Sequence, residues 1–315
     1  MKDMIKAAVI GVGNMGKHHA RVYSELKDCA LVAVVDKNEK AAKEVATQFD
    51  CDYYTDVSDI IGKVDCASVV VPTFLHRDVA ITLLENGIDV LLEKPIAMST
   101  GEADEIIRCA EENGRILQIG HIERFNPAII AARDEINDNP IALEANRIGP
   151  SGGRISDCGV ILDLMIHDVD LILSLVDSAV KDVYASSKTM SGKHEDYAKA
   201  LLTFENGTIA SVCASRISQK RERTLNITLP DKYLCVDCMS KSLSIHKQGK
   251  YEKEDGVTSF SDIVERPLIR QSEPLKLELE SFLSCVRERT VPVVTGAQGK
   301  LALEIVEGIL EAANG

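Results

Sequence analysis

The chain has 315 residues, enough for two domains, because a single hydrophobic core seldom grows beyond about 250–300 residues. Hydrophobic residues at 45% and charged residues at 27% are typical of a globular protein. The net charge of −13 argues against nucleic acid or an acidic membrane as a partner, since either would need a basic surface.

The first pattern in the chain is an apolar run at residues 5–10, a glycine-rich turn, and an amphipathic stretch at residues 17–26. This order predicts strand, turn and helix. Gly11 would let the chain turn sharply, Gly13 would let backbone N–H groups approach a pyrophosphate, and Gly16 would let the helix pack closely on the strand. The predicted dinucleotide-binding turn comprises Gly11, Val12, Gly13, Asn14, Met15 and Gly16.

The next apolar run, residues 30–35, predicts a second strand that ends in Asp36. Three glycines in a loop are a weak signal alone, but Asp36 lies twenty residues after Gly16, where a carboxylate accepts hydrogen bonds from an adenosine ribose. The carboxylate would repel a 2′-phosphate, and Lys37 is the only basic neighbour. The sequence therefore favours NAD as the cofactor and leaves NADP open.

Short apolar runs and helical patterns alternate as far as Gly120, which is typical of a parallel sheet with helices on both faces. The patterns predict strands near Tyr53 and at 66–71, 88–92 and 116–119, with helices at 39–48, 77–86 and 100–113. We therefore expect a nucleotide-binding domain at residues 1–120 and a second domain at residues 121–315.

The second domain has a different pattern, dominated by strands in series. We expect helices at 127–136, 160–176, 274–288 and 298–312, and strands at 141–148, 180–187, 197–204, 208–215, 224–229, 233–238 and 242–246. Asn206-Gly207 is a strong signal for a tight hairpin between two of these strands. Such a series indicates a mostly antiparallel sheet.

Two loops follow predicted parallel strands at their carboxyl ends, where ligands of such sheets bind. They contain Pro72, Thr73 and His76 in one, and Glu93, Lys94 and Pro95 in the other. A lysine in a strand-end loop is usually a solvated surface residue. Beside a nicotinamide, however, the ammonium of Lys94 would hold a substrate hydroxyl and stabilise a developing alkoxide.

Asp163 and His167 lie four residues apart on the predicted helix 160–176, which places them on one face. Their neighbours are mostly apolar, so both polar side chains need a partner or a function. One interpretation is an Asp–His pair that satisfies itself inside a core. The other is a general base at His167 that removes a hydroxyl proton, with Asp163 orienting it or relaying the proton.

Other features of the sequence limit the environment of the protein. No cluster has the spacing of metal ligands, so we expect no metal site. The nine cysteines are irregularly spaced and fit a reducing compartment, and Cys235 and Cys238 read as cysteines of a β-hairpin. There is no secretory signal and no apolar run near the ~18 residues that span a bilayer, so we expect a cytoplasmic protein.

The glycine turn, the loop at 72–76, Glu93-Lys94-Pro95 and the helix with Asp163 and His167 resemble, in this order and spacing, the Gfo/Idh/MocA family. The resemblance covers nearly the whole chain. It implies an N-terminal Rossmann domain with a doubly wound parallel sheet, then an α+β domain whose open, mostly antiparallel sheet carries the substrate site and the oligomer interface. It implies a catalytic group of Lys94, Asp163 and His167, and cofactor contacts at Pro72, Thr73, His76, Glu93 and Lys94.

Within the family, residues 120–127 and 154–160 are similar to the branch of UDP-N-acetylglucosamine 3-dehydrogenases. This resemblance implies that Arg124 and Arg154 grip the diphosphate and that Asn126 also contacts substrate; alternatively, both arginines are structural. We therefore expect an NAD-dependent dehydrogenase acting on the 3-hydroxyl of UDP-N-acetylglucosamine, assembled as a homodimer or homotetramer. The alternatives are an inositol or free-sugar dehydrogenase of the same family and a non-catalytic NAD-sensing regulator.

Overall fold

The structure is a computed structural model that describes residues 4–150, 158–190, 192–252 and 258–314. The chain forms two compact units, unit 1 with residues 1–122 and 273–303 and unit 2 with residues 123–272 and 304–315. The C-terminal stretch 273–303 thus belongs to unit 1, although the chain reaches it only after residues 123–272 of unit 2. The predicted division into domains at residues 1–120 and 121–315 stays a prediction.

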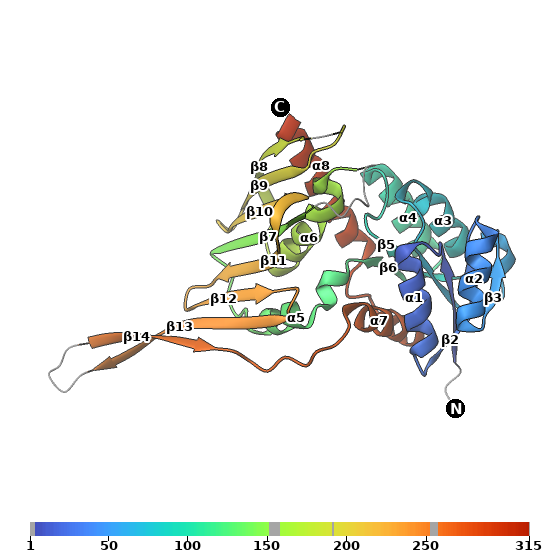
Figure 1. Ribbon diagram of the computed structural model, residues 1–315, viewed down its shortest axis with the longest axis horizontal. Coiled ribbons are helices and arrows are strands. Elements are labelled where there is room, and N and C mark those ends of the chain that lie inside the picture. The colour runs from blue at the N-terminus through green and yellow to red at the C-terminus, as the bar shows by residue number, and fades with distance from the viewer. Residues whose placement is uncertain (1–3, 151–157, 191, 253–257, 315) are drawn as a thin grey trace. The chain divides into compact units, whose positions relative to one another are not determined.

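The described part of unit 1 contains a six-stranded parallel sheet in the order β3-β2-β1-β4-β5-β6 (Figure 1). Its strands are β1 (Ile5–Ile10), β2 (Cys29–Val35), β3 (Asp52–Tyr54), β4 (Cys66–Val69), β5 (Asp89–Glu93) and β6 (Leu117–Gly120). Helices cover both faces of a parallel sheet, so its central strands need apolar side chains on both sides and appear in the sequence as short apolar runs. The doubly wound sheet predicted from the sequence is confirmed.

The helices of unit 1 cover the sheet from two sides, since right-handed crossovers reverse face where the strand order reverses at β1 and β4. They are α1 (Asn14–Glu25), α2 (Glu39–Phe49), α3 (His76–Glu85), α4 (Thr100–Glu112) and α7 (Pro274–Glu288). Helix α7 packs beside α1 (Figure 1). Leu279 and Phe282 of α7 share one apolar core with Cys66 of β4 and Leu91 of β5. Helix α7 therefore covers sheet surface that α1 and α2 leave open, which explains why the chain returns to unit 1.

The described part of unit 2 contains an eight-stranded sheet in the order β14-β13-β12-β11-β7-β10-β9-β8. Its strands are β7 (Ala142–Pro150), β8 (Val180–Lys188), β9 (Tyr197–Phe204), β10 (Ile209–Ser215), β11 (Ile217–Thr228), β12 (Lys232–Asp237), β13 (Ser242–Glu252) and β14 (Thr258–Glu265). Strands β7 and β10 pair in parallel and the other neighbours pair antiparallel, so the mostly antiparallel sheet is confirmed.

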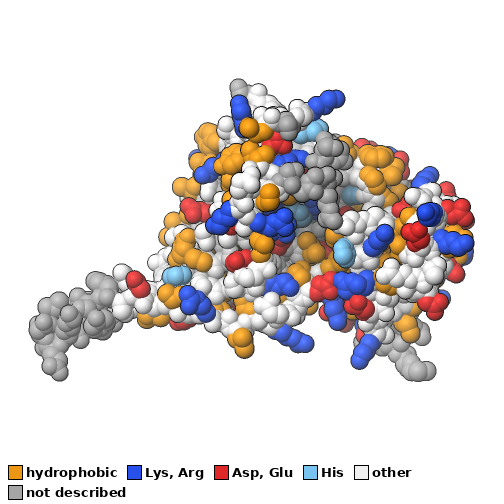
Figure 2. Space-filling model, viewed as in Figure 1, with side chains coloured by type: hydrophobic (Ala, Val, Ile, Leu, Met, Phe, Trp, Pro, Cys, Tyr) orange, Lys and Arg blue, Asp and Glu red, His pale blue; other side chains and the backbone are white. Residues whose placement is uncertain are grey.

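Helices cover one face of this sheet and leave apolar side chains on the other. Helix α5 (Pro127–Asp134) packs on β12 and β13, while α6 (Ile166–Leu175) packs on β7 and β10; α8 (Gly296–Asn314) ends the chain. On the opposite face Tyr184 and Leu201 stand directly across from each other and are 59% and 40% exposed. Figure 2 shows hydrophobic side chains at the surface over β8 and β9.

Several elements of unit 2 differ from the sequence prediction. Strand β11, predicted at 224–229, begins seven residues earlier, at Ile217. The strand predicted at 242–246 extends to Glu252 and pairs with β14, which the sequence did not indicate, forming a long hairpin (Figure 1). Residues 261–265 of β14 are exposed, so no apolar alternation marked the strand. The helix predicted at 160–176 begins as a π-helix, Ile161–Met165, and continues as α6.

Candidate active site

The glycine turn after β1 has the local geometry expected of a pyrophosphate-binding turn. Gly11 has a φ of +90°, and an added Cβ would lie 2.7 Å from the carbonyl oxygen of Val70. An added Cβ at Gly16 would overlap the Gly11 carbonyl, whereas one at Gly13 would meet no protein atom within 4 Å. Helix α1 begins at Asn14 without a side-chain cap, which leaves its first amides for an anion.

A pocket of about 690 Å³ opens beside this turn within unit 1. Its lining includes Gly11, Gly13, Asp36 and Pro72. The Asp36 carboxylate is held by backbone donors, because Oδ2 accepts from the N–H of Val12 at 2.8 Å and Oδ1 accepts from that of Asn38 at 2.8 Å. The volume, the glycine turn and the fixed acid together fit a nicotinamide dinucleotide.

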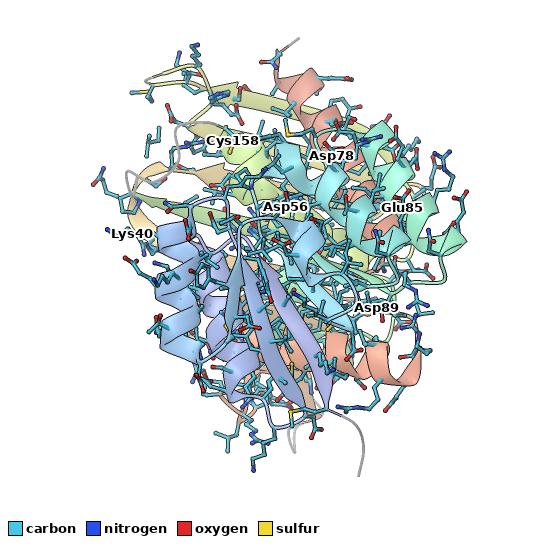
Figure 3. The ribbon with its side chains drawn as sticks, turned by 90° about the vertical axis from the view of Figure 1, so that its right-hand side faces the viewer. Lys40, Asp56, Asp78, Glu85, Asp89 and Cys158 are labelled. Carbon is cyan, nitrogen blue, oxygen red and sulfur yellow. The ribbon has the colours of Figure 1, made fainter. Side chains whose placement is uncertain are left out.

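The pocket is lined by more acids than the sequence indicated. Asp56 follows β3, and Asp78 lies in the first turn of α3; both line the pocket and lie near one end of the strands, whereas Asp89 lies at the other end (Figure 3). Hydrogen bonds from the backbone N–H and hydroxyl of Ser58 hold the pKa of the Asp56 carboxyl below its ordinary value. With Asp36, three carboxylates face one ammonium, that of Lys37, which disfavours an added 2′-phosphate.

His76 joins the two strand-end loops of unit 1. Its Nδ1 lies 2.9 Å from the carbonyl oxygen of Pro95, and its Nε2 lies 2.9 Å from that of Val71. The side chain is 1% exposed, and burial lowers its pKa although both carbonyls oppose this shift. His76 therefore fixes the loop that begins at Pro72 against the loop that contains Lys94. Thr73 begins a short 3-10 helix, Thr73–Leu75, in the first of these loops.

Glu93 links the lysine loop to α1. Its Oε1 lies 3.2 Å from Nε2 of His19, and its Oε2 accepts from the backbone N–H of Lys94 at 3.2 Å. Burial alone would raise the pKa of Glu93, but His19 and Lys94 hold it below its ordinary value. An added Cβ at Gly120 would lie 3.1 Å from the Glu93 carboxyl carbon, so a larger residue in β6 would press on this carboxylate. Neither His19 nor Gly120 was identified from the sequence as part of this group.

Glu278 of α7 is a second buried acid in this part of unit 1. The residue is fully buried, and within the described residues neither carboxylate oxygen has a hydrogen-bond partner. Burial, together with the charge of Glu93, raises the pKa of Glu278 well above its ordinary value. Its backbone carbonyl accepts from the amide of Gln118 at 3.3 Å. The charge of this pair of acids therefore resides on Glu93.

Unit 2 holds the other two predicted catalytic residues. Asp163 lies in the π-helix and His167 in the first turn of α6; both are half-buried. A π-turn is closed by i to i+5 bonds and is wider than an α-turn, so residues four apart still lie near one face. The residue after His167 is anchored, because the guanidinium of Arg147 on β7 donates two 2.8 Å hydrogen bonds to Asp168. Burial alone would lower the pKa of the Arg147 guanidinium, but the carboxylates of Asp168 and Glu123 raise it above its ordinary value.

Two of the predicted substrate residues of unit 2 form hydrogen bonds to other residues of the protein, and the third lies outside the described residues. The guanidinium of Arg124 is 4% exposed and donates two 2.7 Å hydrogen bonds to Asp170. The Asn126 side chain caps α5 and donates to Glu123 and to the carbonyl of Cys238. Both side chains are therefore engaged within unit 2, and their binding of a diphosphate stays a prediction. Arg154 lies outside the described residues.

The predicted catalytic group is thus divided along the chain, with Lys94 in unit 1 and Asp163 and His167 in unit 2. No group of three or more potential metal ligands occurs among the residues that the structure describes. Over the same residues, no helix is both long and apolar enough to cross a membrane. All nine cysteines lie in the described ranges and are free thiols, and Cys235 lies in a strand of the predicted hairpin.

Comparisons with known proteins cover both units. Residues 5–121 match the model for the oxidoreductase family with an NAD-binding Rossmann fold, and residues 145–231 match the GFO/IDH/MocA C-terminal domain. UDP-N-acetylglucosamine 3-dehydrogenase of Acidithiobacillus ferrooxidans is 35% identical over 95% of this chain and 94% of its own. Its solved structure has a TM-score of 0.92 at 33% identity, over 98% of both chains. The NAD⁺-dependent scyllo-inositol 2-dehydrogenase of Bacillus subtilis is 26% identical over 97% of this chain and 93% of its own.

Proposed function

The chain belongs to the Gfo/Idh/MocA family of NAD-binding oxidoreductases, and we propose that it is the dehydrogenase that oxidises the 3-hydroxyl of UDP-N-acetylglucosamine. The observation that supports this substrate is the similarity to UDP-N-acetylglucosamine 3-dehydrogenase. This similarity extends over nearly all of both units. Because the relatives are named dehydrogenases, we prefer a dehydrogenase to the alternative of a non-catalytic NAD-sensing regulator.

The proposed reaction separates a hydride and a proton from one carbinol group. Bound NAD supplies the acceptor of the hydride that leaves the carbon. His167 accepts the proton of the hydroxyl, and Asp163 orients the imidazole. Lys94 holds the same oxygen and stabilises the negative charge that develops before the carbonyl forms.

The hydrogen bond between the Glu93 carboxylate and the backbone of Lys94 supports the role proposed for Lys94. The Glu93 carboxylate accepts from the N–H of Lys94, and His19 holds that carboxylate from α1. A lysine on a fixed backbone reaches its substrate with less loss of backbone freedom than one on a mobile loop. Pro72 and the turn from Gly11 to Gly16 would hold the dinucleotide in the pocket.

The second candidate is an inositol or free-sugar dehydrogenase. It is favoured by the internal ion pair of Arg124, which removes one of the two cations expected to bind a diphosphate, and by the similarity to scyllo-inositol 2-dehydrogenase. Under the first proposal the diphosphate would be bound by Arg154, so this residue distinguishes the two. Arg154→Ala should raise the KM for a nucleotide sugar and leave that for an inositol unchanged.

We also propose that the uncovered sheet face of unit 2, around Tyr184 and Leu201, forms the contact between copies in a homodimer or homotetramer. Apolar side chains on neighbouring strands of one open face favour such a contact. Light scattering coupled to size exclusion would measure the mass, and Tyr184→Lys should lower it.

The function is tested by absorbance of NADH after mixing the protein with NAD and either UDP-N-acetylglucosamine, UDP-glucose, glucose or an inositol. We expect NADH only with the acetylated nucleotide sugar, even if a single turnover is all that accumulates. Lys94→Ala and His167→Ala should abolish this signal, while His167→Ala still binds NAD in calorimetry. NADH with an inositol and none with the nucleotide sugar would replace the first proposal by the second.

A further inference from the structure

The helix that carries Asp163 and His167 is capped by a distant segment. Val160, at its start, makes no side-chain capping bond. Instead Glu195, in the connection between β8 and β9, accepts two of the first amides. Its carbonyl oxygen accepts from the N–H of Val160 at 3.1 Å, and its Oε1 accepts from that of Ile161 at 3.0 Å. A carboxylate in this place satisfies donors that the helix itself cannot satisfy and complements the positive end of its dipole.

Gly159 provides the space for this carboxylate. The glycine is buried, and its φ lies outside the left-handed range, so backbone freedom does not explain it. A Cβ built at this position would overlap the Cδ, Oε1 and Oε2 atoms of Glu195. Any larger residue at position 159 would therefore expel the carboxylate from the start of the helix.

The segment around Glu195 is itself fixed by Arg216, which follows β10. One guanidinium nitrogen of Arg216 donates to the carbonyl of Cys158 at 2.6 Å and lies 3.4 Å from that of Glu195. The backbone N–H of Arg216 donates to the carbonyl of Asp196 at 2.9 Å. Cys158, two residues before Val160, and Glu195, which caps the helix, are thus tied to the same arginine.

We propose that Glu195 is a positioning residue for Asp163 and His167, acting as the cap of their helix through the gap left at Gly159. Asp163 lies in the first turn, where its N–H donates to the carbonyl of Gly159 at 3.1 Å, and His167 lies one turn further along. The π-turn Ile161–Met165 carries Asp163 and continues directly into α6, which carries His167. The inference rests on the proposed function, because it assigns Glu195 to the orientation of the proposed base.

The test compares two substitutions that break the same contact from opposite sides, Glu195→Ala and Gly159→Ala, alone and together. Gly308→Ala is the matched control, because a Cβ at this position in α8 would meet no atom within 4 Å. Glu195→Gln keeps an oxygen that accepts from Ile161 and loses the charge. Each protein is examined by amide exchange at Ile161, the ring resonances of His167, NADH formation and calorimetric binding of NAD.

We expect both alanine variants to speed exchange at Ile161 by about five- to tenfold and to shift the His167 resonances. Turnover should fall by about 10- to 100-fold because the base is misplaced. Binding of NAD should change by less than about twofold, since its pocket belongs to unit 1. The double variant should match the single ones, and Glu195→Gln should retain most of the turnover.

Additive losses in the double variant, or unchanged His167 resonances in both single variants, would overturn the positioning role. Loss of thermal stability with turnover per folded molecule unaltered would do the same, leaving Glu195 as a structural cap. If the unaltered protein oxidises none of the sugars or inositols, the proposed function fails. The His167 resonances and the exchange at Ile161 then decide the role of Glu195 without reference to turnover.

Discussion

Glu278 should make the protein less stable as the pH rises, and Glu278→Gln should remove this dependence. The carboxyl is buried without a partner among the described residues, and its pKa is raised in the folded protein. In the unfolded chain its pKa is about 4.3. Above that pH the unfolded chain releases a proton that the folded protein retains, so the free energy of unfolding falls by about 1.4 kcal/mol per pH unit. The stability supplied by the neutral acid is complete below the unfolded pKa and is lost as pH rises toward the folded pKa.

Above the unfolded pKa the difference between Glu278→Gln and the parent should therefore grow with pH in favour of the variant, by at most about 1.4 kcal/mol per pH unit. Urea unfolding of both proteins at several pH values measures it, and other titrating groups cancel in the difference. Glu280→Gln is the control, because Glu280 lies on the exposed face of the same helix and should give a constant difference. A constant difference for Glu278→Gln as well would refute the conclusion that Glu278 is held neutral.

Two further predictions concern the cofactor pocket and the buried ion pair. Asp36→Asn should improve binding of NADP relative to NAD by about tenfold, because it removes one charge beside the ribose; calorimetry measures both affinities, and Asp50→Asn, outside this pocket, should leave the ratio unchanged. Asp170→Asn should lower the free energy of unfolding by about 3–5 kcal/mol by leaving the buried Arg124 without its charged partner, whereas Glu105→Gln, in the exposed pair with Arg77, should cost under about 1 kcal/mol. Unaltered stability in Asp170→Asn, with a raised KM for the sugar, would make Arg124 a substrate ligand after all.

The elements that the sequence predicted well are those whose signal is local. The first strand, the glycine turn and Asp36 are read from neighbouring residues, and Gly11 has the positive φ that this order requires. Helix α7 was also predicted with the correct bounds, Pro274–Glu288. Its place was not, because periodicity shows that a helix has an apolar face but not which sheet this face covers.

The roles of individual polar residues were harder to predict, because their partners lie far away in the chain. Arg124 in a polar loop segment resembles a phosphate ligand until Asp170 is found beside it, 46 residues later. His19 was one of two adjacent histidines on a helix, and only the fold places it against Glu93, 74 residues later. An arginine and a carboxylate that neutralise each other leave no local pattern in a single sequence.

The acids of unit 1 show why the lysine loop depends on more than its own three residues. Glu93 holds the backbone of Lys94 as an anion, and it is an anion because His19 of α1 pairs with it. Burial and the charge of Glu93 raise the pKa of Glu278, so Glu278 stays neutral and the negative charge is on Glu93. Glu278 arrives with α7 only after residues 123–272 of unit 2 have been traversed, so the electrostatic environment of Glu93 includes an acid from a segment far along the chain.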